Sequence, residues 1–294
     1  MEFDESLSTV HAYLCADGYV IKNPDTQKQK YYYIGFRNTN LVLLKDFQKR
    51  FREYFGIVPR LIEGKRCVVQ NKELYEKLIR KFGSFYSRDW KMPSLDNKLD
   101  RKWLRAFFDC EGWVFCKHHQ NRHIGLDSIN EEGIDQVVNA LNRIGIKTIK
   151  KTIKKRGIFR IFIFGKDNLK RFEKEVGFLH PDKKEKLAKA IRDYMDYIWR
   201  FPKDNCKEIV LGILKEKARI KKPYPVRVVS KEESNLLMLK EKLSNFFLIH
   251  SLVHKRINGI GTIYYELSIN RKEDIKKLIN LKVIPNIFKE RPIG

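Results

Sequence analysis

The sequence predicts an α+β protein made of two tandem αββαββα half-domains, each with an antiparallel sheet, followed by a C-terminal β-α-β-β-α module. Two observations lead to this fold class. A pattern of strands and amphipathic helices occurs twice at a nearly constant offset, and glycines end the corresponding helices. We expect a first half-domain at 1–95, a second with a terminal helix at 96–201, and the module at 202–294.

The first copy extends over residues 31–83. It begins with a strand at Tyr31–Arg37, followed by an amphipathic helix, LVLLKDFQKRFREYFG, that ends at Gly56. Two short strands, in IVPRLIEGK and RCVVQN, then precede a helix, KELYEKLIRKFG, that ends at Gly83. Apolar residues in the helices recur at positions i, i+3 and i+4, whereas β-branched and aromatic residues dominate the strands.

The second copy, at residues 122–177, repeats this order. It contains the strand RHIGLDSI, the helix EEGIDQVVNALNRIG, the strand pair IKTIKKTIKKRG and IFRIFIFG, and the helix KDNLKRFEKEVG. Lys72 and Lys166 open the last helices and lie 94 residues apart (166 − 72), as do Gly83 and Gly177 (177 − 83). Agreement at separated landmarks indicates an internal repeat.

The chain is strongly basic. Its 61 Lys and Arg residues face 36 Asp and Glu residues, which gives a formal net charge of +25. Such a charge favours polyanions, nucleic acid before an anionic membrane. The alternative is the lysine-rich surface of a thermophilic protein, in which Lys and Glu would rise together. No apolar run approaches the roughly 18 residues of a membrane span, and the acidic N-terminus is unlike a signal peptide. We therefore expect an intracellular, cytoplasmic protein associated with the nucleoid and no membrane partner.

The five cysteines form no CxxC pair, as expected for reduced thiols in a cytosol. Possible zinc ligands lie close in sequence at Cys110, Cys116, His118, His119 and His123. Their spacing matches no structural zinc pattern. Small buried cysteines and surface histidines are the expected arrangement.

A short helix that ends in an acid and a glycine precedes each copy: VHAYLCADG with Asp17, and LRAFFDCEG with Glu111. The two acids are 94 residues apart (111 − 17), the offset of the repeat. Small residues four apart place a narrow face on each helix. These small residues are Ala12 and Ala16 in the first helix and Ala106 and Cys110 in the second. Two such helices can pack closely about a pseudo-two-fold axis, which would bring the acids side by side.

The expected position of the acids is unfavourable unless a cation compensates. A carboxylate at a helix C-terminus meets the negative end of the macrodipole, and two neighbouring carboxylates repel each other. Mg²⁺ relieves both penalties and keeps coordination sites for water and phosphate. The metal can then activate water for phosphodiester hydrolysis. The alternative interpretation is that ADG and CEG are ordinary turns.

A weaker third copy follows a long helical stretch and Pro202, a natural boundary. It contains the strand PVRVVS, the helix KEESNLLMLKEKLSNFF, a strand pair that turns around Gly259 and Gly261, and a helix that opens at Lys272. Lys217 stands where the offset would place an acid. We therefore expect a non-catalytic module that extends a DNA footprint, stabilises the fold or binds RNA. The residues that would extend the footprint are Lys255, Arg256 and Arg271.

The two acid-bearing segments resemble the paired motifs of the LAGLIDADG homing endonucleases, in the single-chain, two-motif form. The resemblance covers roughly residues 7–190 and includes the strand order and the segment GFLHPDKKEKL. Neither motif is ideal. His11 and Arg105 replace a small residue, and Glu111 replaces the usual second Asp while keeping the carboxylate.

The resemblance implies a monomeric, site-specific endonuclease that cuts both strands of double-stranded DNA across the minor groove. Asp17 and Glu111, with the adjoining Gly18 and Gly112, match the metal-binding positions, which would hold two or three Mg²⁺ or other divalent cations. Lys72 and Lys166 match positions that often carry a basic residue near the scissile phosphate. The sheets would form a saddle over the major groove.

Basic residues are frequent on the expected strands of both copies, above all between Ile146 and Gly157. An antiparallel sheet can lie in a major groove and contact bases with alternate side chains. The alternative is a solvated sheet edge protected by lysines. The predicted DNA-binding residues are Lys28, Lys30, Arg37, Arg60, Lys65, Arg66, Lys147, Lys150, Lys151, Lys154, Lys155, Arg156 and Arg160.

Two other functions remain open at this point. The same fold could serve an RNA-splicing maturase, with intron RNA as partner, or a DNA-binding regulator, neither of which needs cleavage. A lysine-rich structural protein is the third alternative. An intein is not expected, because residue 1 is neither Cys nor Ser and no terminal His-Asn pair is present.

Overall fold

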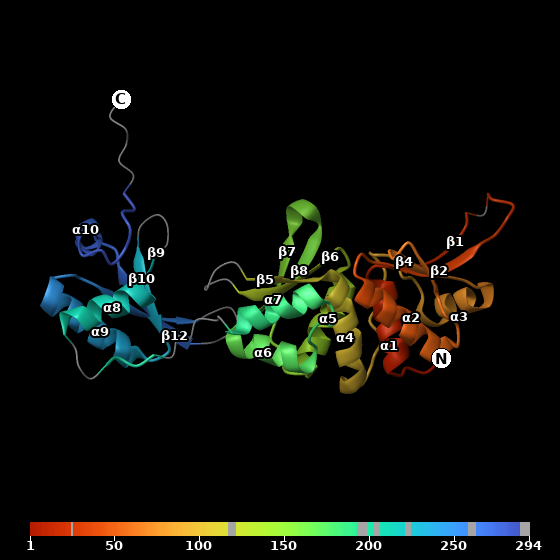
Figure 1. The fold of residues 1–294 in the computed structure, drawn as a ribbon, viewed down its shortest axis with the longest axis horizontal. Coiled ribbons are helices and arrows are strands. Elements are labelled where there is room, and N and C mark those ends of the chain that lie inside the picture. The colour runs from red at the N-terminus through yellow and green to blue at the C-terminus, as the bar shows by residue number, and fades with distance from the viewer. Residues whose placement is uncertain are drawn as a thin grey trace, which may run out of the picture. The chain divides into compact units, whose positions relative to one another are not determined.

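The structure is a computed structural model that describes residues 1–24, 26–116, 122–192, 199–202, 206–220, 225–257 and 263–288. The chain divides into two compact units, residues 1–194 and 195–294, and each has its own hydrophobic core. Figure 1 shows the elements of both units. His118 and His119 of the considered zinc cluster, and the predicted turn at Gly259 and Gly261, lie outside the described residues.

Unit 1 contains two half-domains with the same order of elements. The first consists of α1 (Glu5–Cys15), β1 (Gly18–Lys22), β2 (Tyr32–Arg37), α2 (Leu41–Phe55), β3 (Arg60–Ile62), β4 (Arg66–Gln70) and α3 (Lys72–Phe82). The second consists of α4 (Asn97–Glu111), β5 (Gly112–Phe115), β6 (His123–Ser128), α5 (Glu131–Arg143), β7 (Ile149–Ile153), the 3-10 turn η1 (Lys154–Arg156), β8 (Ile158–Phe164), α6 (Lys166–Glu175) and α7 (Pro181–Arg192). The α+β prediction is confirmed, and the repeated order of elements is as the sequence indicated.

The helices begin and end where local signals predict. Asp4 and Asp96 cap α1 and α4, since their side chains accept hydrogen bonds from the backbone N–H groups of Leu7 and Leu99. Helix α2 ends at Gly56, whose φ of 69° is the left-handed conformation that glycine adopts without strain. The helices with the acids are longer than predicted, because both extend several residues toward the N-terminus.

Each half-domain has a four-stranded antiparallel sheet, with strand orders β1-β2-β4-β3 and β5-β6-β8-β7. Alternate residues of the central strands, such as Ile34 and Phe36 of β2 or Ile124 and Leu126 of β6, are fully buried in the core. In Figure 1 the helices of unit 1 lie beneath the strands. We call the sheet surface opposite this core the open face; residues of neighbouring strands that pair directly lie on the same face.

One core extends through both half-domains of unit 1. Helix α1 is at its centre, because every residue from Ser6 to Cys15 is buried, as expected for a helix surrounded by protein on all sides. Helix α4 packs against it. The repeated halves therefore form a single folded body around a helix pair.

Unit 2 contains α8 (Lys207–Lys217), β9 (Arg219–Ile220), β10 (Val226–Ser230), α9 (Glu233–Phe247), β11 (Leu252–Ile257), β12 (Ile263–Ile269) and α10 (Lys272–Asn280). Its strand order, β11-β12-β10-β9, is the order of the other two sheets viewed from the opposite edge. The expected β-α-β-β-α module is thus extended at its beginning by a helix and a short strand. Within the described parts of the chain, no helix has the length and apolarity needed to cross a bilayer.

Candidate active site

Helices α1 and α4 make the close contact that their small residues predict. Ala12 and Ala106 are both fully buried, and Ala16 and Cys110 are partly buried and pack against the same core. Small side chains allow two helix backbones to approach, and large neighbours such as Tyr13 fill the flanks. The helix pair therefore holds both helix C-termini in one place.

The two bulky departures from the small-residue pattern are accommodated by polar contacts. Trp103 Nε1 donates a hydrogen bond to His11 Nδ1 at 3.1 Å, which links α4 to α1. Burial lowers the pKa of His11 to about 3, so the imidazole is neutral. Arg105 pairs with Asp46 at 3.3 Å, and the same carboxylate accepts a hydrogen bond from the Tyr13 hydroxyl at 3.0 Å.

A glycine follows each acid because the chain turns tightly against its own helix. A Cβ atom at Gly18 would lie 2.4 Å from the Leu14 Cα atom, and one at Gly112 would lie 2.6 Å from the Phe108 carbonyl oxygen. Neither backbone atom can move away cheaply. Both glycines open the strands β1 and β5, so they fix the direction in which the acids leave the helices.

The structure brings Asp17 and Glu111 together. Burial and then the negative charge of Asp17 raise the pKa of Glu111 to about 7, with a smaller contribution from Asp127. A carboxyl with this pKa is only partly ionised at neutral pH. The mutual repulsion that the sequence predicted for two acids at adjoining helix ends is therefore present.

Two polar neighbours orient Asp17. The Asn38 side-chain amide donates a hydrogen bond to Asp17 Oδ2 at 2.9 Å, and the Cys110 side chain also hydrogen-bonds Asp17. The Arg37 backbone N–H donates to the Asp17 carbonyl oxygen at 3.1 Å. Asn38 follows β2 directly, so the end of this strand determines the position of the carboxylate.

Lys183 is a site residue that sequence reasoning missed. Its Nζ donates hydrogen bonds to the carbonyl oxygens of Phe108, Asp109 and Cys110 at 3.3, 2.6 and 3.0 Å. The Phe108 carbonyl oxygen also accepts a hydrogen bond from the Gly112 backbone N–H, whereas those of Asp109 and Cys110 lie in the last turn of α4, where carbonyls have no partner within the helix. The ammonium also lowers the pKa of Glu111, while burial lowers the pKa of Lys183 itself. The position of this cation is set by the start of α7, in the segment GFLHPDKKEKL.

Asp109 fastens the same segment to α4. Its carboxylate accepts hydrogen bonds from the backbone N–H groups of Leu179 and His180, both at 2.9 Å. Burial raises the pKa of Asp109 to about 6, and these hydrogen bonds oppose the increase. Asp109 therefore acts as an anchor for α7, and through it for Lys183.

The placement of Lys72 and Lys166 corrects their predicted role. Asp17 lies beside Arg37 at one end of β2, whereas Asn71, which precedes Lys72, bonds the Tyr32 carbonyl oxygen at the other end. The two ends of β2 are five residues apart, which is about 16 Å along a strand. Lys72 therefore lies at the end of the sheet remote from Asp17. Lys72 contacts Glu76 at 3.9 Å and the ring of Tyr32 instead.

Lys166 has the equivalent position in the second half-domain. It follows β8, whose last residue, Phe164, pairs with His123 at the start of β6. Gly112, next to Glu111, pairs with Leu126 near the other end of β6. Both lysines therefore lie at the far ends of their sheets, and the cation that acts on Glu111 is Lys183.

The basic residues predicted on the first sheet lie on its open face or in its loops. Arg37 pairs directly with Arg66 across β2 and β4, and Arg60 pairs with Val68 on the same face. Lys65 is in the turn between β3 and β4, and the loop that joins β1 to β2 contains Lys28 and Lys30.

The second sheet divides its predicted DNA-binding residues between two faces. Lys151 pairs with Arg160 on the open face, although Arg160 forms an ion pair with Asp127 at 2.6 Å. Lys150 is on the opposite face and is held by Asp135 at 2.6 Å and Glu131 at 3.0 Å, both from α5. The prediction for Lys150 is therefore corrected. Lys154, Lys155 and Arg156 form the 3-10 turn between β7 and β8, and Lys147 precedes β7.

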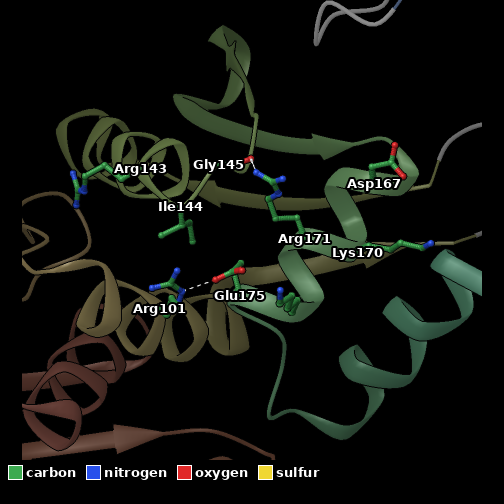
Figure 2. A pocket seen from close by; sticks show the side chains of 9 residues that line it. Arg101, Arg143, Ile144, Gly145, Asp167, Lys170, Arg171 and Glu175 are labelled. Carbon is green, nitrogen blue, oxygen red and sulfur yellow. Dashed lines mark hydrogen bonds and ion pairs between the residues drawn. The ribbon is translucent and has the colours of Figure 1, made fainter.

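A separate surface pocket lies between α4, α5 and α6 (Figure 2), and neither Asp17 nor Glu111 lines it. Its guanidinium groups already have partners. Arg101 pairs with Glu175 at 2.6 Å, Arg171 donates to the Gly145 carbonyl oxygen at 3.2 Å, and Arg143 pairs with Asp100 at 2.6 Å. These contacts join the helices of the second half-domain.

The two acids fit a divalent cation as an incomplete ligand set. Carboxylate oxygens are preferred by Mg²⁺, which retains several waters and binds substrate phosphate. The raised pKa of Glu111 indicates a need for positive charge at this point. Over the described residues, no group of three or more His, Cys, Asp and Glu side chains could hold a metal ion. Water and a phosphate oxygen would have to complete the coordination.

Comparison with known proteins gives a family match over the second half-domain. The family model of the LAGLIDADG-like domain matches residues 98–177. The replication factor C small subunit of Thermococcus kodakarensis is 33% identical over 94 residues, which are 31% of this chain and 10% of that protein. Homing endonuclease I-ApeI of Aeropyrum pernix is 25% identical over 135 residues, which are 43% of this chain and 60% of that protein.

Among solved structures, the homing endonuclease I-DmoI in complex with DNA and Mn matches 58% of this chain and 97% of its own, at 16% identity and a TM-score of 0.43. The matching segment spans about a tenth of the replication factor C relative. The resemblance expected from the paired acid-glycine motifs is confirmed: the chain carries a LAGLIDADG-like domain and is related to the LAGLIDADG homing endonucleases.

Proposed function

We propose that the chain is a site-specific DNA endonuclease that makes double-strand breaks by divalent-cation-dependent hydrolysis. The observation that supports it best is the meeting of Asp17 and Glu111 at the ends of α1 and α4, where the charge of one raises the pKa of the other to about 7. Two acids at the junction of two repeated halves can serve the two strands of a duplex. Relatedness to I-ApeI, which is named as a homing endonuclease, agrees with this activity.

The chain's own groups would prepare the site in three ways. Asn38 holds the carboxylate of Asp17 in one orientation, and Lys183 neutralises the carbonyl oxygens that end α4. Glu111 would have to lose its proton in order to hold a divalent cation. A divalent cation such as Mg²⁺ would supply a polarised water and stabilise the leaving oxygen.

The open faces of both sheets would bind the duplex. Arg37, Arg60 and Arg66 on the first sheet present guanidinium groups suited to guanine edges and phosphates. On the second sheet, Lys151 and the basic turn Lys154–Arg156 supply phosphate contacts. Lys150 is not part of this surface, because α5 holds it.

The decisive experiment is cleavage of a DNA library with Mg²⁺ by the full chain and by Asp17→Asn and Glu111→Gln. Both substitutions keep the size of the side chain but remove a metal ligand, so we expect double-strand cleavage to be lost while duplex binding persists. Sequencing of the cut ends would give the recognition site. Normal cleavage by both variants would contradict the proposal.

A maturase role with intron RNA as partner is the second candidate. Unit 2 favours it, because this unit adds a further sheet with basic residues on β11, including Lys255 and Arg256, but ends its first helix in Lys217 instead of an acid. Splicing of an intron transcript that persists in Asp17→Asn would support this role, since no metal-bound acid is needed for RNA binding.

A further inference from the structure

A carboxylate and a guanidinium meet on the open face of the second sheet, at the end nearest the candidate active site. Asp127 of β6 pairs directly with Arg160 of β8. Leu126, the residue before Asp127, is buried in the core on the other face. Gly112 pairs with Leu126, so Asp127 is the β6 residue that lies beside Glu111.

The contact between these two side chains is bidentate. Arg160 Nε donates a hydrogen bond to Asp127 Oδ1, and Nη2 donates one to Oδ2, both at 2.6 Å. The guanidinium also lies against two rings, since its central carbon is 5.4 Å from the centroid of Trp113 and 5.8 Å from that of Phe162. The Arg160 side chain is therefore held in one orientation, although 25% of it remains exposed.

The way in which Asp127 holds Arg160 determines which N–H groups can bind a ligand. A guanidinium has five N–H groups in a rigid, planar fork, and Asp127 accepts from Nε and from one N–H of Nη2. The end of the fork, formed by Nη1 and the other N–H of Nη2, presents two parallel donors. In the major groove, the N7 and O6 atoms of guanine are two neighbouring acceptors that match this end of an arginine.

Stability alone does not account for the pair. Partly exposed ion pairs contribute little to folding. Asp127 also adds negative charge beside Glu111, which is unfavourable in the absence of a cation. An arginine that is fixed in advance loses less conformational entropy when it binds, so the gain from this pair is in recognition.

The first sheet has two cations at the equivalent place. Arg37 has the position of Asp127, because each follows the residue that pairs with the glycine of the motif. Arg66 has the position of Arg160, because each pairs with that residue. Like charges directly opposite each other repel, so neither arginine of the first sheet holds the other. The two half-domains therefore offer different chemistry to the two halves of a DNA site.

We propose that Asp127 positions Arg160 to read a guanine in the major groove, which makes the pair a specificity determinant for the base pairs next to the cleavage position. The inference rests on the proposed function in one respect, that duplex DNA lies on the open faces. Arg160 makes the contact with the base. Asp127 is a positioning residue that acts through Arg160.

The test is selection of bound duplexes from a randomised DNA library by the full chain in EDTA. We expect the wild type to enrich guanine at one position, and Arg160→Gln to lose this preference, because the shorter amide lacks the fork. Binding of the enriched duplex, measured by fluorescence anisotropy, should weaken roughly 5- to 150-fold. Lys151→Gln is the matched control, since it removes the same charge from the residue that pairs with Arg160. It should weaken binding of all duplexes alike and keep the guanine.

Asp127→Ala tests the positioning role. The variant gains one positive charge, so binding of mixed-sequence duplexes should strengthen while the preference for guanine at that position weakens. An ion pair that serves stability alone would leave the base preference in place. Asp135→Ala is the matched control, because Asp135 pairs with Lys150 at the same distance of 2.6 Å on the other face. It raises the charge equally and should leave the preference intact. Thermal melting of each variant would show that it is folded.

Guanine enrichment that is unchanged in Arg160→Gln or in Asp127→Ala would overturn the inference, as would an equal loss of preference in Asp127→Ala and Asp135→Ala. Failure of the proposed function is seen separately. A library that yields no sequence preference with the wild type would overturn site-specific binding itself. Normal cleavage by Asp17→Asn and Glu111→Gln would contradict the nuclease mechanism and leave the guanine contact standing.

Discussion

Glu111 is the residue whose environment has the clearest measurable consequence. Its carboxyl has a pKa of about 7 in the folded chain, whereas the ordinary pKa of a glutamate is 4.5. The folded state therefore binds this proton more tightly than the unfolded state does. The stabilisation is present below about pH 4.5 and is lost as the pH rises through about 7.

We accordingly expect Glu111→Gln to stabilise the chain in EDTA at pH 8, by roughly 1–3 kcal/mol, and to have little effect at pH 4.5. Thermal unfolding at both pH values would measure this difference. Added Mg²⁺ should stabilise the wild type at pH 8 more than the variant. Equal stability of the two proteins at pH 8 in EDTA would show that ionisation of Glu111 does not destabilise the folded chain.

Lys183 gives a second prediction for a single residue. Lys183→Met removes three hydrogen bonds to the end of α4 and the cation that lowers the pKa of Glu111. We expect a stability loss of about 1–3 kcal/mol and a cleavage pH profile displaced to higher pH, because Glu111 would hold its proton more tightly. Lys184→Met is the matched control, since Lys184 is the exposed next residue of α7. A profile that stays in place would assign Lys183 a packing role only.

At the scale of elements, the helix pair α1 and α4 determines the distance between the acids. Ala106→Leu adds volume at a fully buried position of this contact. We expect a loss of about 1–3 kcal/mol from overpacking and a fall in cleavage at temperatures where the protein stays folded. Ala190→Leu overpacks an equally buried position in α7 and should cost similar stability. If both variants cut equally well, the separation of the helices does not control the reaction.

The sequence could predict this helix pair because its evidence is local and repeated. An offset of 94 residues relates Asp17 to Glu111, and small residues at matching positions indicate which faces meet. The contact of Lys183 with α4 could not be predicted in the same way. It depends on where α7 returns after two further helices, and no periodicity in the chain reports that path.

The two corrections have equally specific causes. The segment that contains Lys150 has isoleucines at positions 146, 149 and 153, and these spacings of three and four do not reveal a strand's period of two. The sequence alone therefore does not show which side chains of this segment face the core and which lie on the open face. The family resemblance predicts Lys72 near the scissile phosphate, and hence near the acids. Strand order decides otherwise, since β4 runs parallel to β1 and ends far from where β1 begins.

Two adjacent lysines on β7 make it possible to test whether DNA binds to a defined face of the molecule. Lys151 is on the open face and Lys150 is held by α5 on the other. If duplex DNA lies on the open faces, Lys151→Ala should reduce the slope of log K against log salt by about 1. Lys150→Ala should leave the slope unchanged. Equal effects of the two substitutions would indicate diffuse attraction by the net charge of +25 instead of a defined face.

Unit 2 repeats the plan of the half-domains down to individual strand pairs. Across the first sheet, Val68, Gly35 and Tyr19 pair in a row. Across the sheet of unit 2, the corresponding row is formed by Ser268, Arg227 and Arg219. Both rows end two residues after the motif position that is Asp17 in the first half-domain and Lys217 in unit 2.

An odd number of such halves has a chemical consequence. In the proposed mechanism, each junction needs two carboxylates, one from each of two packed helices, so a half-domain without a packed partner could not cut DNA. The helix of unit 2 shows Glu208, Gly212 and Glu216 to solvent at the positions where α1 meets its mate. Lys217→Asp should therefore create no second cutting centre, because this face of α8 is exposed within unit 2, which supplies no second motif helix in its described residues to share a cation.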